Sequence, residues 1–190
     1  MKNILSHIPT IETERLILRP LSFADDAAIY AYASDPEVTK FVSFDTARSI
    51  EDTRIFLNTA LENYSKGIDP ASLAITLKKE NKLIGGIGWL NWSDLHKRIE
   101  IGYVLARPEW NKGYVSEAVI AFIGYSFTNS DLIRIEARCV RENAASAKVM
   151  EKAGMSYEGT LRKHQFFKGE QCDMKIYSVI RDEWLRQSDH

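Results

Sequence analysis

One segment constrains the fold more than any other: residues 99–127, where a strand pattern passes through a short glycine-containing loop into a helix pattern. The strand IEIGYVLA (99–106) alternates two faces, and the helix YVSEAVIAFIGYSF (114–127) places apolar residues along one stripe. Another strand pattern follows at 132–140. The segment therefore predicts a strand–helix–strand crossover, the connection that joins parallel strands of one sheet.

The remaining elements can be placed around this unit. Pro20, Gly67 and Gly154 end elements, whereas Ser49 and Asn143 are suited to begin helices. The predicted strands cover 14–19, 71–77, 83–90, 157–167 and 172–180, and the other predicted helices cover 22–33, 49–67 and 143–154. Hairpins followed by crossovers predict an α/β fold, with one mixed sheet of about seven strands and helices on both faces. We expect residues 1–190 to form a single domain with its core at about 13–184.

Composition narrows the class of protein. Hydrophobic residues make up 45% and charged residues 27% of the chain, which is typical of soluble globular proteins, and the net charge of -1 offers no basic surface for nucleic acid or anionic membrane. No apolar run can span a bilayer and no signal-peptide pattern is present, so we expect a cytoplasmic protein with Cys139 and Cys172 as free thiols. The four histidines lack metal-binding spacing, so no metal is expected.

The loop RPEWNKG (107–113) predicts an anion site. Where a strand turns through glycine into a helix, several backbone N–H groups point at one spot and the helix dipole adds a partial positive charge. Lys112 adds a full charge beside Gly113. The loop matches neither the Walker pattern nor the dinucleotide fingerprint. The alternative interpretation is that Gly113 only supplies a positive φ before the helix.

A second glycine cluster, Gly85-Gly86-Ile87-Gly88, has a different context. It lies inside a strand pattern and leads into Trp89 instead of a helix. Glycine within a strand usually marks a bulge or a close approach of two backbones. We therefore predict a structural role for this cluster.

From Thr13 to Trp184 the chain resembles the GCN5-related N-acetyltransferases (GNAT family), and more closely the Rim-type branch that acetylates N-termini of ribosomal proteins. The matching segments are ETERLILRP, GGIGW, IEIGYVL, WNKGYVSEAV, RIEARCVRENAASAKVMEKAGMSYEG and the D-x-x-x-Y pair Asp173 and Tyr177. The resemblance implies a GNAT-like central mixed sheet. It also implies acetyl-CoA as co-substrate and an amine as acceptor.

The resemblance further implies where coenzyme A would bind. The pantetheine arm would lie in a gap where the strands 99–106 and 132–140 splay apart, contacting backbone groups of Val104 and Leu105 and the side chain of Asn143. The phosphates would be surrounded by Asn111, Lys112, Gly113, Tyr114, Val115 and Ser116. The sequence departs from the family pattern in having Trp110 for Gln or Arg, Asn111 for Gly and Val115 for Gly or Ala.

Two residues are candidates for the chemistry. Glu100, in the central strand, can serve as a general base for the amine, directly or through a water, because a carboxylate suffices for an α-amine. Its alternative role is an ion pair with Arg98 or Arg134. Ser146 shares the inward face of the helix opened by Asn143 and is the candidate acid for the leaving thiolate. Its alternative role is that of a small first-turn residue.

The sequence therefore predicts an N-acetyltransferase that uses direct attack in a ternary complex, as a monomer or homodimer. The acceptor is a protein N-terminal α-amine or a small-molecule amine such as a polyamine, amino sugar or antibiotic. The alternative from another class is a coenzyme-A-binding module without catalysis. Trp89, Trp92 and Trp110 could line the acceptor pocket, although packing is the more common role of such aromatic residues.

Overall fold

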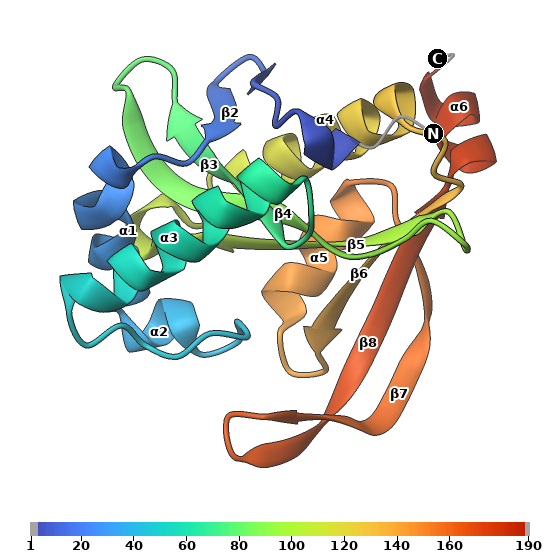
Figure 1. The fold of residues 1–190 in the computed structure, drawn as a ribbon. Helices are drawn as coiled ribbons and strands as arrows, with labels where there is room; N and C mark the ends of the chain where they lie inside the picture. The colour runs from blue at the N-terminus through green and yellow to red at the C-terminus, as the bar shows by residue number, and fades with distance from the viewer. Residues whose placement is uncertain (1–3, 189–190) are drawn as a thin grey trace.

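The computed structural model describes residues 4–188 and is built around one mixed sheet (Figure 1). Its eight strands lie in the order β1-β2-β3-β4-β5-β6-β8-β7. They span Ile11–Glu12 (β1), Leu16–Pro20 (β2), Ala71–Leu77 (β3), Lys82–Ser93 (β4), Arg98–Leu105 (β5), Arg134–Val140 (β6), Ser156–Phe167 (β7) and Glu170–Ile180 (β8). The β5–β6 pair is parallel and the other pairs of this sheet are antiparallel. The predicted α/β fold with a mixed sheet is confirmed.

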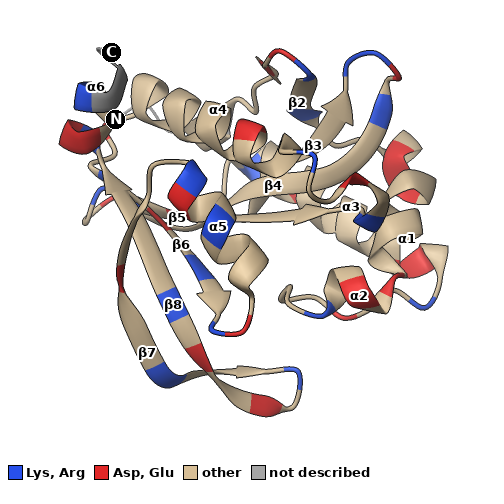
Figure 2. Ribbon diagram, turned by 180° about the vertical axis from the view of Figure 1, so that it is seen from behind, with Lys and Arg blue, Asp and Glu red and all other residues tan. Residues whose placement is uncertain are grey.

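Helices cover both faces of the sheet, as Figures 1 and 2 show from opposite sides. The helices α1 (Asp26–Ala33), α2 (Pro36–Thr39) and α3 (Ile50–Lys66) lie on one face, and α4 (Tyr114–Asn129) and α5 (Ala144–Lys152) lie on the other. A last helix, α6, spans Arg181–Ser188. Short 3-10 helices occupy Ile4–Ser6 (η1), Phe23–Asp25 (η2) and Arg107–Glu109 (η3). No helix in this part of the chain is long and apolar enough to cross a membrane.

The larger hydrophobic core lies under α4 and explains the role of Trp89. Its indole is fully buried and stacks on Phe122 with 4.2 Å between ring centroids. The indole N–H donates to the Ser126 hydroxyl over 2.8 Å, so the buried polar atom is satisfied. Trp89 is therefore a core residue and does not line the acceptor pocket.

Local signals in the sequence set the ends of helices as expected. In α3 a capping box joins Ser49 and Asp52, and Gly67 closes the helix with a φ of 62°. The Asn143 carboxamide caps α5 by accepting from the Ser146 amide. Gly154 follows α5 with a φ of 79°. These caps are confirmed.

The glycine cluster in β4 is structural, as predicted. A Cβ added to Gly85 would meet the Val104 carbonyl oxygen at 2.3 Å, and one added to Gly88 would meet the Ala71 carbonyl oxygen at 2.9 Å. The register of the β3–β4 pair also shifts beside this cluster, between Ile75 and Thr76. Glycine is required at Gly85 and Gly88 because the neighbouring backbone approaches too closely for a side chain, whereas a Cβ on Gly86 would meet its nearest atom at 3.6 Å.

Three elements differ from the sequence prediction. The sheet has eight strands instead of about seven, because the two-residue strand β1 is too short to show a periodic pattern. The helix expected from Ser22 begins as the 3-10 turn Phe23–Asp25. Helix α6 was not predicted, since its eight residues are mostly polar; Trp184 docks it through a ring contact with Phe127 at 5.5 Å.

Candidate active site

The strands β5 and β6 separate after a short stretch of pairing. They pair from Arg98 with Arg134 to Glu100 with Glu136, a run of three residue pairs. Both strands then continue, to Leu105 and Val140, without further pairing to each other. Strands that part in this way leave backbone groups facing a gap, which is the feature that the family resemblance implied.

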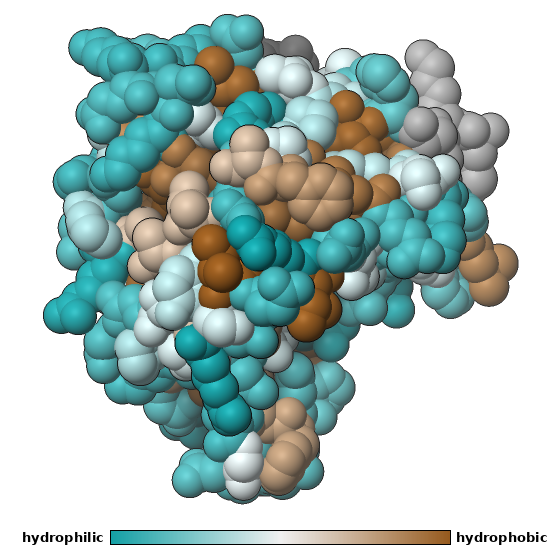
Figure 3. Space-filling view, turned by 60° about the vertical axis from the view of Figure 1, so that its left-hand side comes forward, coloured by the Kyte–Doolittle hydropathy of each residue, from teal (hydrophilic) through white to brown (hydrophobic). Residues whose placement is uncertain are grey.

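The gap opens into a cleft with a volume of about 1110 Å³. Residues of α1, α3, β4, β5, β6, β7 and the 41–48 loop line it. Figure 3 shows the molecule from the side on which α1 and α3 lie, where apolar side chains are interspersed with hydrophilic ones. Between residues 4 and 188, no three His, Cys, Asp or Glu side chains come together in a way that could hold a metal ion. A cleft of this size is typical of the sites in which proteins bind small molecules.

The predicted site residues fall into two groups. Glu100, Val104, Asn143 and Ser146 line the cleft. The other predicted residues lie at the end of β5 and around the start of α4: Leu105, Asn111, Lys112, Gly113, Tyr114, Val115 and Ser116. We call residues 107–116, which are the loop and the first turn of α4, the coenzyme loop, because the family resemblance implies that coenzyme A phosphates bind there.

Backbone direction distinguishes Val104 from Leu105. The Ala106 amide donates to the Ile84 carbonyl of β4 over 2.7 Å. Because alternate residues of a strand point their backbone groups to opposite sides, the Val104 amide also faces β4 and the Leu105 amide faces the gap. The Leu105 carbonyl accepts from the Trp110 indole N–H over 2.8 Å. Of the two residues, Leu105 thus offers its N–H to the gap, and Val104 contributes to the wall of the cleft.

Hydroxyl groups meet where α5 faces β5. The Tyr103 hydroxyl lies 2.9 Å from the Ser146 hydroxyl and 3.1 Å from the Ser146 carbonyl oxygen. The Asn143 carboxamide oxygen accepts from the Ser146 amide over 3.1 Å, which fixes the first turn of α5. Burial raises the pKa of the Tyr103 hydroxyl, so this group stays protonated as a donor. Burial also raises the pKa of the nearby Cys139 thiol, which argues against a thiolate nucleophile.

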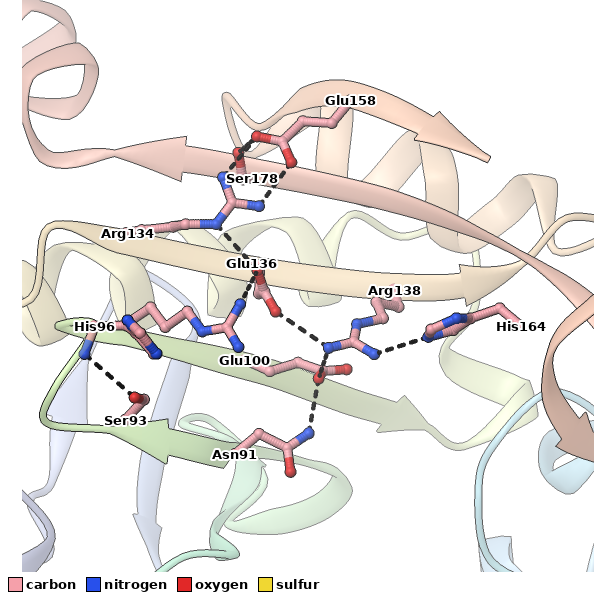
Figure 4. A network of polar contacts seen from close by, with 11 residues as sticks. Asn91, Ser93, His96, Glu100, Arg134, Glu136, Arg138, Glu158, His164 and Ser178 are labelled. Atoms are coloured by element: carbon pink, nitrogen blue, oxygen red, sulfur yellow. Dashed lines mark hydrogen bonds and ion pairs between the residues drawn. The ribbon is translucent and has the colours of Figure 1, made fainter. Parts of the chain in front are cut away.

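Glu100 has a different partner from those the sequence suggested. Its carboxylate accepts from the Asn91 carboxamide over 2.8 Å and forms an ion pair with the Arg138 guanidinium at 3.1 Å. Arg98 and Arg134 instead contact Glu136, at 3.8 and 3.0 Å. The Glu100 side chain is 13% exposed. It lies where β5 leaves β6 and is shown with its neighbours in Figure 4.

Arg134 pairs with a residue of the adjacent hairpin, which accounts for its not reaching Glu100. Its guanidinium makes two hydrogen bonds to the Glu158 carboxylate, of 2.6 and 2.7 Å (Figure 4). Glu158 also accepts from the Ser178 hydroxyl over 2.6 Å. The hydrogen bond from Arg134 lowers the pKa of Glu158 to about 2. Arg134 therefore links β6 to β7, and Arg138 is the residue left to bridge Glu136 and Glu100.

The coenzyme loop has the backbone geometry of an anion site. Asn111 and Gly113 both adopt positive φ, 61° and 82°. Gly113 precedes α4 and has no side chain to cap the first amides of the helix. The Lys112 ammonium pairs with Glu109 at 2.9 Å, and this hydrogen bond is the main cause of the lowered pKa of Glu109. Val115 packs against the larger core, so its bulk is accommodated inside the protein.

Arg15 is a functional candidate that sequence reasoning missed. Its guanidinium donates to the Lys112 carbonyl over 3.0 Å, pairs with Glu117 at 2.6 Å and lies 4.6 Å from the centre of the Tyr114 ring. Partial burial alone would raise the pKa of Glu117, but hydrogen bonds from Thr13 and Arg15 lower it. Arg15 thus anchors the coenzyme loop. The only signal was its place in the ETERLILRP segment, because the contact spans about a hundred residues of sequence.

Comparison with known proteins agrees with this geometry. A family model for the acetyltransferase (GNAT) domain matches residues 15–156. The chain is 34% identical over 175 residues to the uncharacterized N-acetyltransferase YoaA of Bacillus subtilis (strain 168), which covers 91% of this chain and 97% of that protein. The chain belongs to the GNAT family. It is therefore an N-acetyltransferase, an acyltransferase by reaction class.

Two further proteins are similar to this GNAT protein, one in structure and one in sequence. The crystal structure of a GNAT-family acetyltransferase from Bacillus anthracis superposes with a TM-score of 0.82 at 35% identity, covering 92% of this chain and 99% of that one. The ribosomal-protein-serine acetyltransferase of Escherichia coli (strain K12) is 29% identical over 135 residues, which cover 71% of this chain and 74% of that protein. The second likeness supports the relation to the Rim-type branch.

Proposed function

We propose that this N-acetyltransferase transfers the acetyl group of acetyl-CoA directly to a primary amine in a ternary complex, and that a protein N-terminal α-amine is the acceptor. The observation that carries the proposal is the cleft at the parting of β5 and β6, because it brings Glu100 and Ser146 to one continuous space. Direct transfer needs donor and acceptor in such a space at the same time. We further propose that residues 13–184 form one N-acetyltransferase domain.

The residues present fit coenzyme A. Its phosphates would lie at the coenzyme loop, against the first amides of α4 and near Lys112, since helix N-termini bind phosphate groups. Its pantetheine arm would lie in the gap, where the Leu105 amide faces and the Asn143 side chain lines the wall. When bound, acetyl-CoA supplies the thioester that is the acyl donor.

The residues of the cleft divide the proton transfers between them. Glu100 would take a proton from the amine, directly or through one water; an α-amine has a pKa of about 7.7–8.0, so it is readily deprotonated near neutral pH. Ser146 would donate a hydrogen bond to the departing thiolate. The Tyr103 hydroxyl, held 2.9 Å from that of Ser146, would support it as a second donor.

Charge in the cleft supports an acceptor that arrives as an ammonium ion. Its walls carry the carboxylates of Asp45, Asp52, Asp69 and Glu100. Asp45 pairs with Lys168 and Glu100 pairs with Arg138, whereas Asp52 and Asp69 accept hydrogen bonds from backbone amides and keep their charge. The name of the Escherichia coli relative, a ribosomal-protein-serine acetyltransferase, adds support for a protein acceptor.

A contact between two loops borders the acceptor end of the cleft. Lys168, at the tip of the β7–β8 hairpin, donates to the Phe44 carbonyl and pairs with Asp45 at 3.0 Å. This contact joins the hairpin tip to the loop that precedes α3, next to the cleft-lining residues Gln165 and Phe167.

An acceptor screen tests the proposal. Purified protein is mixed with acetyl-CoA and, separately, with N-terminal peptides, spermidine, glucosamine and an aminoglycoside, and products are identified by mass spectrometry while thiol release is followed. We expect acetylation of the α-amine of a peptide, with stoichiometric thiol release. Coenzyme A binding without transfer to any amine would favour the non-catalytic alternative. Transfer only to polyamine or sugar would reject the N-terminal acceptor.

A further inference from the structure

The Arg138 guanidinium has more donors than partners. An arginine has five N–H donors. Nη2 donates to Glu136 at 3.2 Å and lies 3.1 Å from the Glu100 carboxylate. Nη1 has only a long contact of 3.5 Å to His164 Nε2, and Nε is buried without a partner in the described part of the chain. Arg138 therefore retains hydrogen-bonding capacity beside the proposed base.

Surrounding charges hold this guanidinium in place. Glu136 is buried at 6% exposure and also accepts from Arg134 at 3.0 Å. Because Glu136 lies two residues before Arg138 on β6, its carboxylate fixes the guanidinium on the same face of the strand. Glu100 fixes it from β5. A side chain held between two carboxylates keeps a defined direction, which is a requirement for recognising a ligand.

The opposite side of the guanidinium is set by an irregularity in β7. The β7–β8 register shifts between Leu161 and Gln165, and Lys163 has a φ of 49°. The Lys163 amide donates to the Asp173 carboxylate over 2.9 Å, which stabilises the irregular backbone. Such bulges redirect side chains. Here His164 points toward Arg138, as Figure 4 shows, and both residues line the cleft.

We propose that Arg138 is a specificity-determining residue that recognises the carbonyl oxygen next to the acceptor's amine. In an α-aminoacyl group the carbonyl carbon is bonded to the carbon that carries the amine. An amine beside Glu100 then places its own carbonyl oxygen beside the Arg138 guanidinium, whose Nη2 lies 3.1 Å from Glu100 and whose Nη1 has only the long contact to His164. Alkyl amines and polyamines lack this oxygen. The inference rests on the proposed function and names the residue that would select α-aminoacyl acceptors over alkyl amines.

The charge of the cleft favours a neutral carbonyl over a free carboxylate. Four carboxylates, those of Asp45, Asp52, Asp69 and Glu100, line the cleft against the guanidiniums of Arg48 and Arg138. Arg138 is already shared between Glu136 and Glu100. A third carboxylate beside them would be repelled, whereas an amide or peptide carbonyl accepts a hydrogen bond without adding charge.

The test compares two acceptors in matched variants. Alaninamide and sec-butylamine carry their amine on similar branched carbons, but only alaninamide has a carbonyl. Their kcat/KM values, each expressed per neutral amine, give a preference ratio. Arg138→Met removes the donors and keeps an apolar stem of similar length, and Arg98→Met is the control because Arg98 pairs with Glu136 but does not line the cleft.

We expect wild type to prefer alaninamide, and Arg138→Met to reduce the preference ratio about tenfold or more, the effect of losing a charge-assisted hydrogen bond. Any effect of the substitution on Glu100 acts on both acceptors and cancels in the ratio. Arg98→Met should keep the wild-type ratio. An unchanged ratio in Arg138→Met, or an equal change in Arg98→Met, would overturn the proposal.

A second variant and two further acceptors complete the experiment. If circular dichroism shows that Arg138→Met does not fold, the ratio is measured in Arg138→Lys. A wild-type ratio there would overturn the proposal, because lysine lacks the Nη1 and Nε donors of the guanidinium. Assays with free alanine and an alanine-initiated tripeptide separate the sources of the group: preference for the tripeptide assigns a chain terminus, and equal use of alaninamide assigns a small compound. Failure of wild type to acetylate any amine would instead reject the proposed function.

Discussion

The coenzyme loop and the acceptor side of the cleft are built in opposite ways. The coenzyme loop is contiguous in sequence, and its shape comes from backbone: positive φ at Asn111 and Gly113, then the start of α4. The acceptor side comes from β4, β5, β6 and β7 and consists of Asn91, Glu100, Arg138 and His164, which we call the acceptor wall. Its shape comes from side-chain contacts.

The contrast follows from the parting of β5 and β6. Backbone pairing between them ends at Glu100 and Glu136, so beyond that point no hydrogen bonds of the sheet join β5 to β6, although β5 stays paired with β4 and β6 with β8. The ion pair between Glu100 and Arg138 spans the opening instead. Backbone geometry therefore positions the proposed donor half of the site, and charged side chains position the proposed acceptor half. Substitutions should affect binding of coenzyme in one region and turnover or selectivity in the other.

The largest effect is expected from Glu100→Gln in the acceptor wall. The amide has nearly the same shape but cannot accept a proton at neutral pH, so kcat/KM should fall about a hundredfold or more. The pH–rate profile should also lose its dependence on the base. Coenzyme A affinity, measured by calorimetry, should stay within about twofold of wild type.

Glu158→Gln is the matched control for Glu100→Gln, because Glu158 belongs to the same set of ion pairs but does not line the cleft. It should keep the pH–rate profile. If Glu100→Gln also keeps that profile with a good acceptor, Glu100 is not the base and the acceptor wall has only a structural role.

Gly113→Val tests the coenzyme loop. A β-branched residue is strained at a φ of 82°, at a cost of about 1–3 kcal/mol. If the loop relaxes away from its anion-binding shape, the Kd for coenzyme A should rise about tenfold to a hundredfold. Gly169→Val is the control, since Gly169 has a similar φ of 89° at the β7–β8 turn. A loss of stability with unchanged affinity would support the purely conformational role of Gly113.

Ser146→Ala tests the point where the two regions meet. Alanine suits the first turn of α5, so the fold and coenzyme affinity should be kept. A hydroxyl is a weak acid, and we expect kcat to fall about tenfold, less than for loss of a strong general acid. Tyr103→Phe, which removes the neighbouring hydroxyl, should give a smaller decrease. Unchanged kcat in Ser146→Ala would leave Ser146 as a small helix residue without a catalytic role.

The same contrast explains which parts could be predicted from sequence. Helix ends such as Ser49, Gly67 and Asn143 depend on a few neighbouring residues, and these were predicted correctly. The strand–loop–helix unit was equally readable, because periodicity and Gly113 lie within one short segment. Local chemistry therefore accounts for most of the fold and for the coenzyme loop.

Partners across the sheet could not be predicted in this way. The alternative role predicted for Glu100 was an ion pair with Arg98 or Arg134. Arg134 is instead bound by Glu158, which comes from a strand whose register is known only in the folded protein. The turn of His164 toward Arg138 depends on a register shift that leaves no periodic signal in the sequence. Such contacts are decided by competition among several charged side chains, which spacing along the chain does not reveal.

The smallest predicted effect concerns the stability of the fold at acid pH, to which the ion pair between Arg134 and Glu158 contributes. The hydrogen bond from Arg134 lowers the pKa of Glu158 from its ordinary 4.5 to about 2. A carboxylate with a lowered folded-state pKa stabilises the fold above its unfolded pKa, and this contribution is lost as pH falls from about 4.5 to about 2. Because the Glu158 side chain is 42% exposed, solvent screening reduces the contribution to about 1 kcal/mol.

Urea unfolding of wild type and Glu158→Gln between pH 7 and pH 2 measures this contribution. The variant should be about 1 kcal/mol less stable at pH 7, and most of the difference should be lost by pH 2, where about half of folded wild-type Glu158 is protonated. In an Arg134→Met background the same substitution should have little effect at either pH, since the pair is already broken. A difference that persists in full at pH 2 would mean that Glu158 stabilises the hairpin through packing or through Ser178 instead of through its charge, and that ion pairs do not hold this side of the site together.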